Sequence, residues 1–204
     1  MQKFSSRLLL LTFSLLALTA YAGFPLWLDS PVRSNPRDPA SPFFVPTATP
    51  GPLKVACVGD SITQGSGYSL SVAYPTQLQT LLGSRFIVHN YGVSGKTMMH
   101  NADYPYWSTT AYTNSKSWLP DIVVIMLGTN DSKPYNWVYQ SEFVADAEEL
   151  VNIYKNLPSH PRVYINTCPT VYAPGIYDIT TIVNTDVVPL LYTVAADTGA
   201  TLID

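Results

Sequence analysis

Charged residues are scarce in this chain, which narrows the classes of partner it could have. Only 12% of its 204 residues are charged, and 11 Lys and Arg against 14 Asp and Glu give a formal net charge of −3. Because the basic residues form no cluster, we expect neither nucleic acid nor an anionic membrane surface as a partner. The low charge and the 14 tyrosines are more typical of an extracellular than of a cytosolic protein.

Cysteine is also nearly absent, since only Cys57 and Cys168 occur. In an oxidising compartment such a pair could form a disulfide. The two cysteines fall on strands that we place two positions apart in one sheet, which separates them by about 10 Å at ~4.8 Å per neighbouring strand. A disulfide needs Cα atoms within about 7 Å of each other. We therefore expect two buried free thiols.

A long membrane-spanning run is missing from the N-terminus. The apolar run Leu8–Leu18 is shorter than the ~20 residues that a spanning helix needs. Lys3 and Arg7 precede it, and Ala20-Tyr21-Ala22 matches the small-x-small pattern of a cleavage site. The pattern predicts a signal peptide over residues 1–22 and secretion of the mature protein. The alternative is an uncleaved signal anchor that tethers the protein to a membrane.

The remaining chain divides into a linker and one domain. Residues 23–52 hold eight prolines and no apolar period, which is typical of a Pro-rich linker. After it, short apolar runs alternate with helical patterns. The predicted strands are Leu53–Val58, Phe86–Val88, Ile122–Leu127, Arg162–Thr167 and Thr201–Ile203. The predicted helices are Ala73–Leu82, a helix capped by Ser141 and running to Asn156, and Thr180–Asp197, which Pro189 should kink or split and Gly199 should end.

Alternating strands and helices predict an α/β domain over residues 53–204. Its expected form is a doubly wound parallel sheet in a three-layer α/β/α arrangement. In such sheets the active site lies beyond the carboxyl ends of the strands. Residues that follow strands are therefore the first candidates for chemistry.

Three polar motifs follow the first three predicted strands. In Gly59-Asp60-Ser61, a serine on a strand-to-helix turn presents its hydroxyl at the sheet edge, although a helix cap would use the same residues. Gly95 allows the backbone to approach a ligand, although ordinary turns also use glycine. In Gly128-Thr129-Asn130-Asp131 the amide of Asn130 can point to the same place, although asparagine is also common in turns. Ser94 is not a rival nucleophile, because no G-x-S-x-G elbow occurs in the chain.

Taken together, Ser61, Gly95 and Asn130 resemble the blocks of the SGNH, or GDSL, hydrolase family. The resemblance covers Leu53–Asp204 and implies a flavodoxin-like fold and a serine esterase. It implies that Ser61 is the nucleophile, and that the Ser61 N–H, the Gly95 N–H and the Asn130 amide stabilise the oxyanion. It implies no metal and no organic cofactor.

One block of the family has no counterpart in this chain. The family's base is a histidine in a D-x-x-H motif after strand five, and the sequence stops at Asp204, near the end of that strand. None of His89, His100 and His160 lies in such a motif, so the triad histidine and aspartate are not present. His100, which follows the Gly95 loop, is the one candidate for a substitute base. We expect a C-terminally incomplete domain or, failing that, a degenerate relative, and poor ester hydrolysis by these 204 residues.

Aromatic residues, and a second resemblance that is weaker than the one to the family's blocks, indicate the substrate. Flat rings beside polar groups suit sugar faces, although core packing explains several of them: Tyr68, Tyr104, Tyr106, Trp107, Tyr112, Trp118, Tyr135 and Trp137. The stretch Leu127–Lys133 and the following Tyr135-Asn136-Trp137 resemble family members that act on acetylated carbohydrates. We therefore expect short acyl, chiefly acetyl, esters of carbohydrates as substrates.

Other interpretations stay open. The chain could be a lipase or acylhydrolase acting on lipid esters, or a carbohydrate-binding relative without catalysis. A nucleotide or phosphate binder of the same fold is disfavoured, because no Walker pattern occurs. The sequon at Asn130 should be unoccupied, since a glycan would remove the expected oxyanion donor. The sequence leaves the oligomeric state undetermined.

Overall fold

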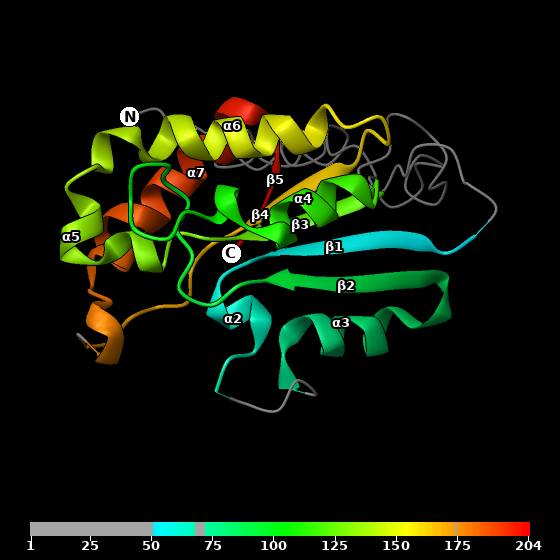
Figure 1. The fold of residues 1–204 in the computed structure, drawn as a ribbon, viewed down its shortest axis with the longest axis horizontal. Helices are drawn as coiled ribbons and strands as arrows, with labels where there is room; N and C mark the ends of the chain where they lie inside the picture. Colours follow the sequence, from blue (N-terminus) through cyan, green and yellow to red (C-terminus); the bar gives the residue numbers. More distant parts are fainter. Residues whose placement is uncertain (1–50, 68–71, 174) are drawn as a thin grey trace, which may run out of the picture. The chain divides into compact units, whose positions relative to one another are not determined.

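The computed structural model describes residues 51–67, 72–173 and 175–204 (Figure 1). The predicted signal peptide and nearly all of the Pro-rich linker lie outside the described residues, as does Tyr68. Within the described ranges, no helix is both long enough and apolar enough to cross a bilayer.

The described strands form one parallel sheet in the order β2-β1-β3-β4-β5. Their bounds are β1 Leu53–Gly59, β2 Phe86–Gly92, β3 Ile122–Met126, β4 Arg162–Asn166 and β5 Thr201–Ile203. All of the predicted strands are therefore confirmed. After β1, the chain forms β2 on one side of it, and β3, β4 and β5 are then added in turn on the other side. The topological switch point therefore lies between β1 and β3.

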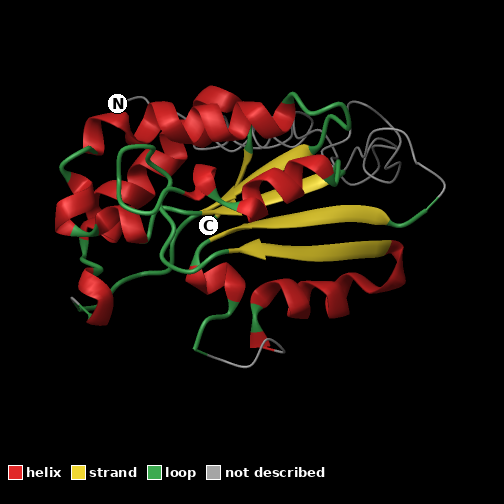
Figure 2. Cartoon of the chain, in the orientation of Figure 1, coloured by secondary structure: helices red, strands yellow, loops and turns green. Residues whose placement is uncertain are grey.

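Helices cover the sheet on two faces (Figure 2). Their bounds are α2 Ser61–Gln64, α3 Tyr74–Leu82, α4 Thr110–Ser117, α5 Pro134–Trp137, α6 Phe143–Lys155 and α7 Val188–Thr198. Single turns of 3₁₀-helix occur at Gly83–Arg85, Tyr106–Ser108, Asn130–Ser132, Gln140–Glu142 and Ile176–Asp178, and a π turn at Val183–Val187. Residues of α3 pack with one face of the sheet, and residues of α4, α6 and α7 with the other. The three-layer, doubly wound arrangement is thus confirmed.

The middle strand β3 is apolar throughout because both of its faces are covered. Along β1, Ala56 and Val58 belong to the large cluster beneath α6 and α7, whereas Val55 and Cys57 belong to the smaller one beneath α3. Cys57 and Cys168 are buried and free, which confirms the expectation of two thiols. Cys168 lies just beyond β4 rather than within a strand.

Two details of the predicted helices turn out differently. Ser141 does not cap α6, because the 3₁₀ turn Gln140–Glu142 runs directly into the helix; Glu142 stands at the cap position, and no side chain makes a capping hydrogen bond there. Pro189 does divide the long helical pattern: the π turn Val183–Val187 precedes α7, whose first turn holds the proline. A proline is tolerated there because the first N–H groups of a helix lack intrahelical partners. The helix α4 has no counterpart among the predicted elements.

Candidate active site

The turn after β1 places Ser61 at the carboxyl edge of the sheet. Asp60 caps the helical turn that starts at Ser61, since its Oδ1 accepts the Ile62 N–H at 2.9 Å. The turn needs glycine at position 59, because a Cβ there would lie 2.6 Å from the backbone oxygen of Met126. The strand therefore passes directly into a tight turn, and Ser61 is its first helical residue.

The loop after β2 carries Gly95 in a left-handed conformation with φ of +77°. A Cβ at this position would meet nothing within 4 Å, so the requirement for glycine comes from the backbone conformation and the space above it is open. The loop is tied to the Ser61 turn, because the Ser94 N–H donates to Gln64 Oε1 at 2.7 Å.

Asn130 joins the two preceding segments from the turn after β3. Its side chain is 4% exposed, and Nδ2 donates to the backbone oxygen of Lys96 at 3.0 Å. The same nitrogen lies 3.4 Å from Oδ2 of Asp60. The structure thus brings the Ser61 turn, the Gly95 loop and Asn130 together. If the Asn130 amide donates to an oxyanion of the substrate, that oxyanion would take the place of Asp60 Oδ2, the more distant of its two acceptors.

Asp60 and Asp131, which adjoin Ser61 and Asn130 in the sequence, have buried carboxyl groups. No sequence pattern assigned a role to either carboxyl group. Asp131 is fully buried, and its carboxylate accepts the N–H groups of Met98 and Met99 at 2.9–3.0 Å. Burial outweighs these bonds and raises the pKa of Asp131 to about 7. Burial also raises the pKa of Asp60 to about 6, against the opposing effects of the Ile62 N–H, the Thr129 side chain and the Lys133 charge.

A pocket of about 330 Å³ adjoins the predicted nucleophile. Its wall consists of Ser61, Ile62, Gly65, Ser66, Val72, Ala73 and Tyr74. The volume is at the small end of the range typical of ligand sites. Neither Gly95 nor Asn130 is among these wall residues, so the pocket adjoins Ser61 from the side of α2 and α3.

The three histidines make their contacts elsewhere. His89 lies in β2 as expected and stacks on Trp118 with ring centroids 4.0 Å apart. His160 is exposed in a turn with φ of +45°, as expected for a surface turn. The ring of His100 stacks on Trp107 at 3.9 Å and contacts Glu149 at 3.2 Å. None of these contacts involves Ser61.

The aromatic residues separate into core and surface. Tyr106, Tyr112 and Trp137 belong to the core, whereas Tyr104 and Tyr135 are 67% and 48% exposed. Tyr104 lies on the loop that follows β2 and Tyr135 in the helix α5, so among these five aromatics they are the two most open to a ligand.

Comparison with known proteins places this arrangement in a family. The family model of the GDSL-like lipase/acylhydrolases matches residues 57–204. The chain belongs to this family. The match begins within β1 and includes the Ser61 turn, the Gly95 loop and Asn130.

Similar proteins include enzymes named for acetylated carbohydrates. An acetylxylan esterase of Xylanibacter ruminicola is 33% identical over an alignment that covers 78% of this chain and 37% of that protein. A carbohydrate acetylesterase family member from Sinorhizobium meliloti is 26% identical, with a TM-score of 0.57, over 74% of this chain and 82% of that one. An aryl esterase from M. smegmatis, 21% identical over 74% and 83% of the two chains, shares the fold with a TM-score of 0.58. The chain spans little more than a third of the acetylxylan esterase.

Proposed function

We propose that the domain is a serine esterase with Ser61 as its nucleophile. Ser61 Oγ would attack the carbonyl carbon of an ester, and the alcohol would leave as an acyl-serine forms. Water would then release the carboxylic acid and free the serine. The N–H groups of Ser61 and Gly95 and the amide of Asn130 would stabilise the oxyanion of both tetrahedral intermediates. The observation that carries this proposal is the pair of contacts from Asn130 to Lys96 and Asp60, which unites three separate segments at one sheet edge.

We further propose acetyl esters of carbohydrates as the substrates. Support comes from the acetylxylan esterase and from the S. meliloti carbohydrate acetylesterase family member, which are similar to this chain. The exposed rings of Tyr104 and Tyr135 agree with a sugar as part of the substrate. Release of acetate from acetylated xylan, compared with cleavage of long-chain p-nitrophenyl esters, distinguishes this substrate class from lipid esters.

Activation of Ser61 needs a general base, and none of the three histidines of this chain contacts it. We therefore expect the 204-residue chain to turn over p-nitrophenyl acetate slowly. Fast turnover that Ser61→Ala abolishes would contradict this expectation, and its loss in His100→Ala would identify His100 as the base.

The nucleophile itself can be tested without turnover. Because acylation also lacks a base in this chain, prolonged incubation with p-nitrophenyl acetate should acetylate the chain slowly, and peptide mass spectrometry should locate the acetyl group on Ser61. Ser61→Ala should remain unlabelled, whereas Ser94→Ala, a change in the neighbouring loop, should keep the label. Binding of acetylated xylan without any acetyl-serine would instead favour a carbohydrate-binding protein without catalysis.

We also propose that the protein is secreted after cleavage between Ala22 and Gly23. The small-x-small pattern at Ala20-Tyr21-Ala22 supports this site. N-terminal sequencing of protein recovered from the medium should begin at Gly23, and recovery in the membrane fraction with residues 1–22 attached would support a signal anchor.

A further inference from the structure

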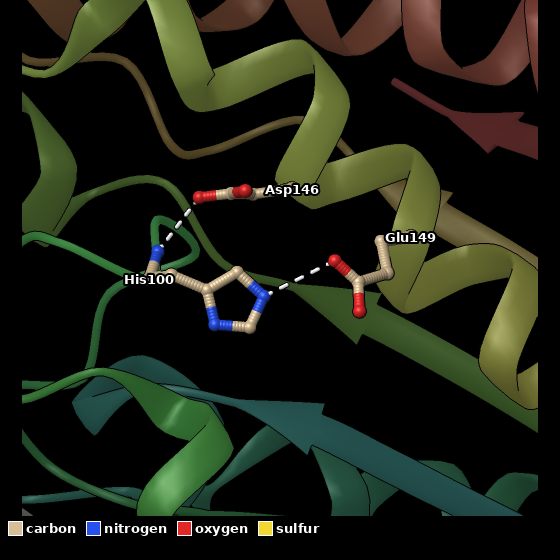
Figure 3. Close-up of side chains that lie close together, drawn as sticks. All are labelled: His100, Asp146 and Glu149. Atoms are coloured by element: carbon tan, nitrogen blue, oxygen red, sulfur yellow. Dashed lines mark hydrogen bonds and ion pairs between the residues drawn. The ribbon is translucent and has the colours of Figure 1, made fainter.

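Three side chains of metal-ligating type lie together on the surface between the loop after β2 and the helix α6. They are His100, Asp146 and Glu149 (Figure 3). His100 Nε2 lies 3.2 Å from Glu149 Oε2, and one ligating atom from each residue lies within 4.8 Å of the other two. The side chains of His100 and Glu149 are 39% and 55% exposed, so solvent ions reach them freely.

The imidazole of His100 is held in place before any ligand arrives. It stacks on the indole of Trp107 with a centroid separation of 3.9 Å and an angle of 22° between the planes. The indole is fixed in turn, because Trp107 Nε1 donates to the backbone oxygen of Met98 at 2.7 Å. The backbone N–H of His100 donates to Asp146 Oδ2 at 2.7 Å. These contacts hold the ring so that Nε2 faces α6.

Helix geometry brings the two carboxylates to the same place. Asp146 and Glu149 are three residues apart on α6, so they project from one side of the helix. Glu142 lies one turn before Asp146 on the same side and accepts a hydrogen bond from Asn101 at 3.0 Å. A cation at this point would relieve the repulsion among these carboxylates.

We propose that His100, Asp146 and Glu149 bind a divalent transition-metal ion of the zinc type. One imidazole nitrogen and two carboxylate oxygens supply three protein ligands, and water would complete the coordination. Imidazole suits zinc better than it suits calcium or magnesium, which select oxygen ligands. Tetrahedral zinc with bonds of about 2.0–2.2 Å needs donor atoms roughly 3.3–3.6 Å apart. The donors of His100 and Glu149 are already close to this spacing at 3.2 Å, and the Asp146 carboxylate, within 4.8 Å of both, would have to move toward them to complete the site.

The role of the ion would be to fasten a loop, not to take part in the chemistry. The segment from Gly95 to His100 is held at Met98 and Met99 by Asp131. The backbone N–H of His100 already joins this segment to α6 at Asp146, and an ion would strengthen that attachment through the imidazole. It would therefore limit the motion of the loop that carries Gly95.

Calorimetric titration of the EDTA-treated chain with zinc chloride tests the site. We expect one equivalent of zinc to bind and the melting temperature to rise, whereas calcium and magnesium should have little effect. His100→Ala and Glu149→Gln should each weaken binding at least about tenfold. His160→Ala, which removes another exposed histidine, should bind zinc like the parent chain.

Either of two results would overturn the proposal. One is that the parent chain binds no zinc at a zinc concentration of about 100 μM, which is well above the dissociation constant expected of a built site. The other is equal binding by His100→Ala, which would assign the ion to another surface group. Hydrogen exchange adds a readout of the loop: zinc should slow exchange over residues 96–103 in the parent chain and in His160→Ala, but not in His100→Ala.

Discussion

At the scale of single residues, the two buried aspartates are the features that most affect the candidate site. Asp60 and Asp131 each stand beside a residue that the sequence motifs pointed to, Ser61 and Asn130. Their own contacts depend on the tertiary structure, because the partners of Asp131 are 32 and 33 residues away along the chain. Asp131 holds the Gly95 loop through backbone N–H groups, and no residue pattern in that loop indicates such an attachment.

Asp131→Ala should be strongly destabilising. It leaves the N–H groups of Met98 and Met99 buried without an acceptor, at a cost of about 1–3 kcal/mol for each group. Asp131→Asn keeps one acceptor oxygen and should cost much less. Urea unfolding measures both changes, with Asp197→Ala, which alters an exposed residue of α7, as the control. Equal losses of unfolding free energy in the Ala and Asn variants would contradict the role of the Asp131 side-chain oxygen as the acceptor of these N–H groups.

The same carboxyls predict a pH dependence of stability. The pKa of each is raised in the folded state, to about 6 for Asp60 and about 7 for Asp131. The folded state therefore prefers the protonated forms, and this contribution is full below pH ~4 and lost as the pH rises through about 6–7. Between pH 5 and pH 8 the free energy of unfolding should fall by on the order of a few kcal/mol. The double variant Asp60→Asn, Asp131→Asn should flatten the profile, and an unchanged slope in that variant would show that other groups cause the pH dependence.

At the scale of elements, the candidate site consists of three turns that are joined by side-chain hydrogen bonds. The turn after β1 reaches the loop after β2 through Gln64, and the turn after β3 reaches that loop through Asn130. The strands place the turns at one edge, and these side-chain bonds set their spacing. This explains why each motif alone was ambiguous in the sequence, since a cap or a turn would use the same residues.

Gln64→Met should loosen the Gly95 loop, because the Ser94 N–H then loses its acceptor. Hydrogen exchange at Ser94 should speed up about fivefold, as expected for loss of a bond worth on the order of 1 kcal/mol. Gln64→Glu keeps an acceptor oxygen at nearly the same position and serves as the matched control. Unchanged exchange in Gln64→Met would show that the rest of the loop holds Ser94 in place.

At the scale of the whole molecule, stability rests mainly on one side of the sheet. The cluster beneath α4, α6 and α7 is much larger than the one beneath α3. On the second face, β4 presents half-buried residues such as Tyr164, and Ile203 of β5 is 43% exposed. Packing losses should therefore be greatest on the side of α6 and α7.

Ile125→Ala tests this distribution. Ile125 is fully buried in the large cluster, so the change should cost about 2–5 kcal/mol. Ile87, in the edge strand β2, is 39% exposed, and Ile87→Ala should cost well below that range. Chemical unfolding of both variants gives the comparison, and similar losses would mean that the edge strand β2 contributes as much to stability as the main core.

The amino-acid sequence determined the sheet, the order of its elements and the positions of Ser61, Gly95 and Asn130. These follow from local signals: apolar runs long enough for buried strands, glycines where turns are tight, and polar residues at strand ends. The sequence did not predict the roles of Asp60, Asp131 and Gln64, the helix α4, or the meeting of His100 with Asp146 and Glu149. The cap that Asp60 provides and the helix α4 are local, but the contacts of Asp131, Gln64 and His100 join residues 30 or more positions apart, and only the folded packing of the loop after β2 against α6 and the neighbouring turns decides them.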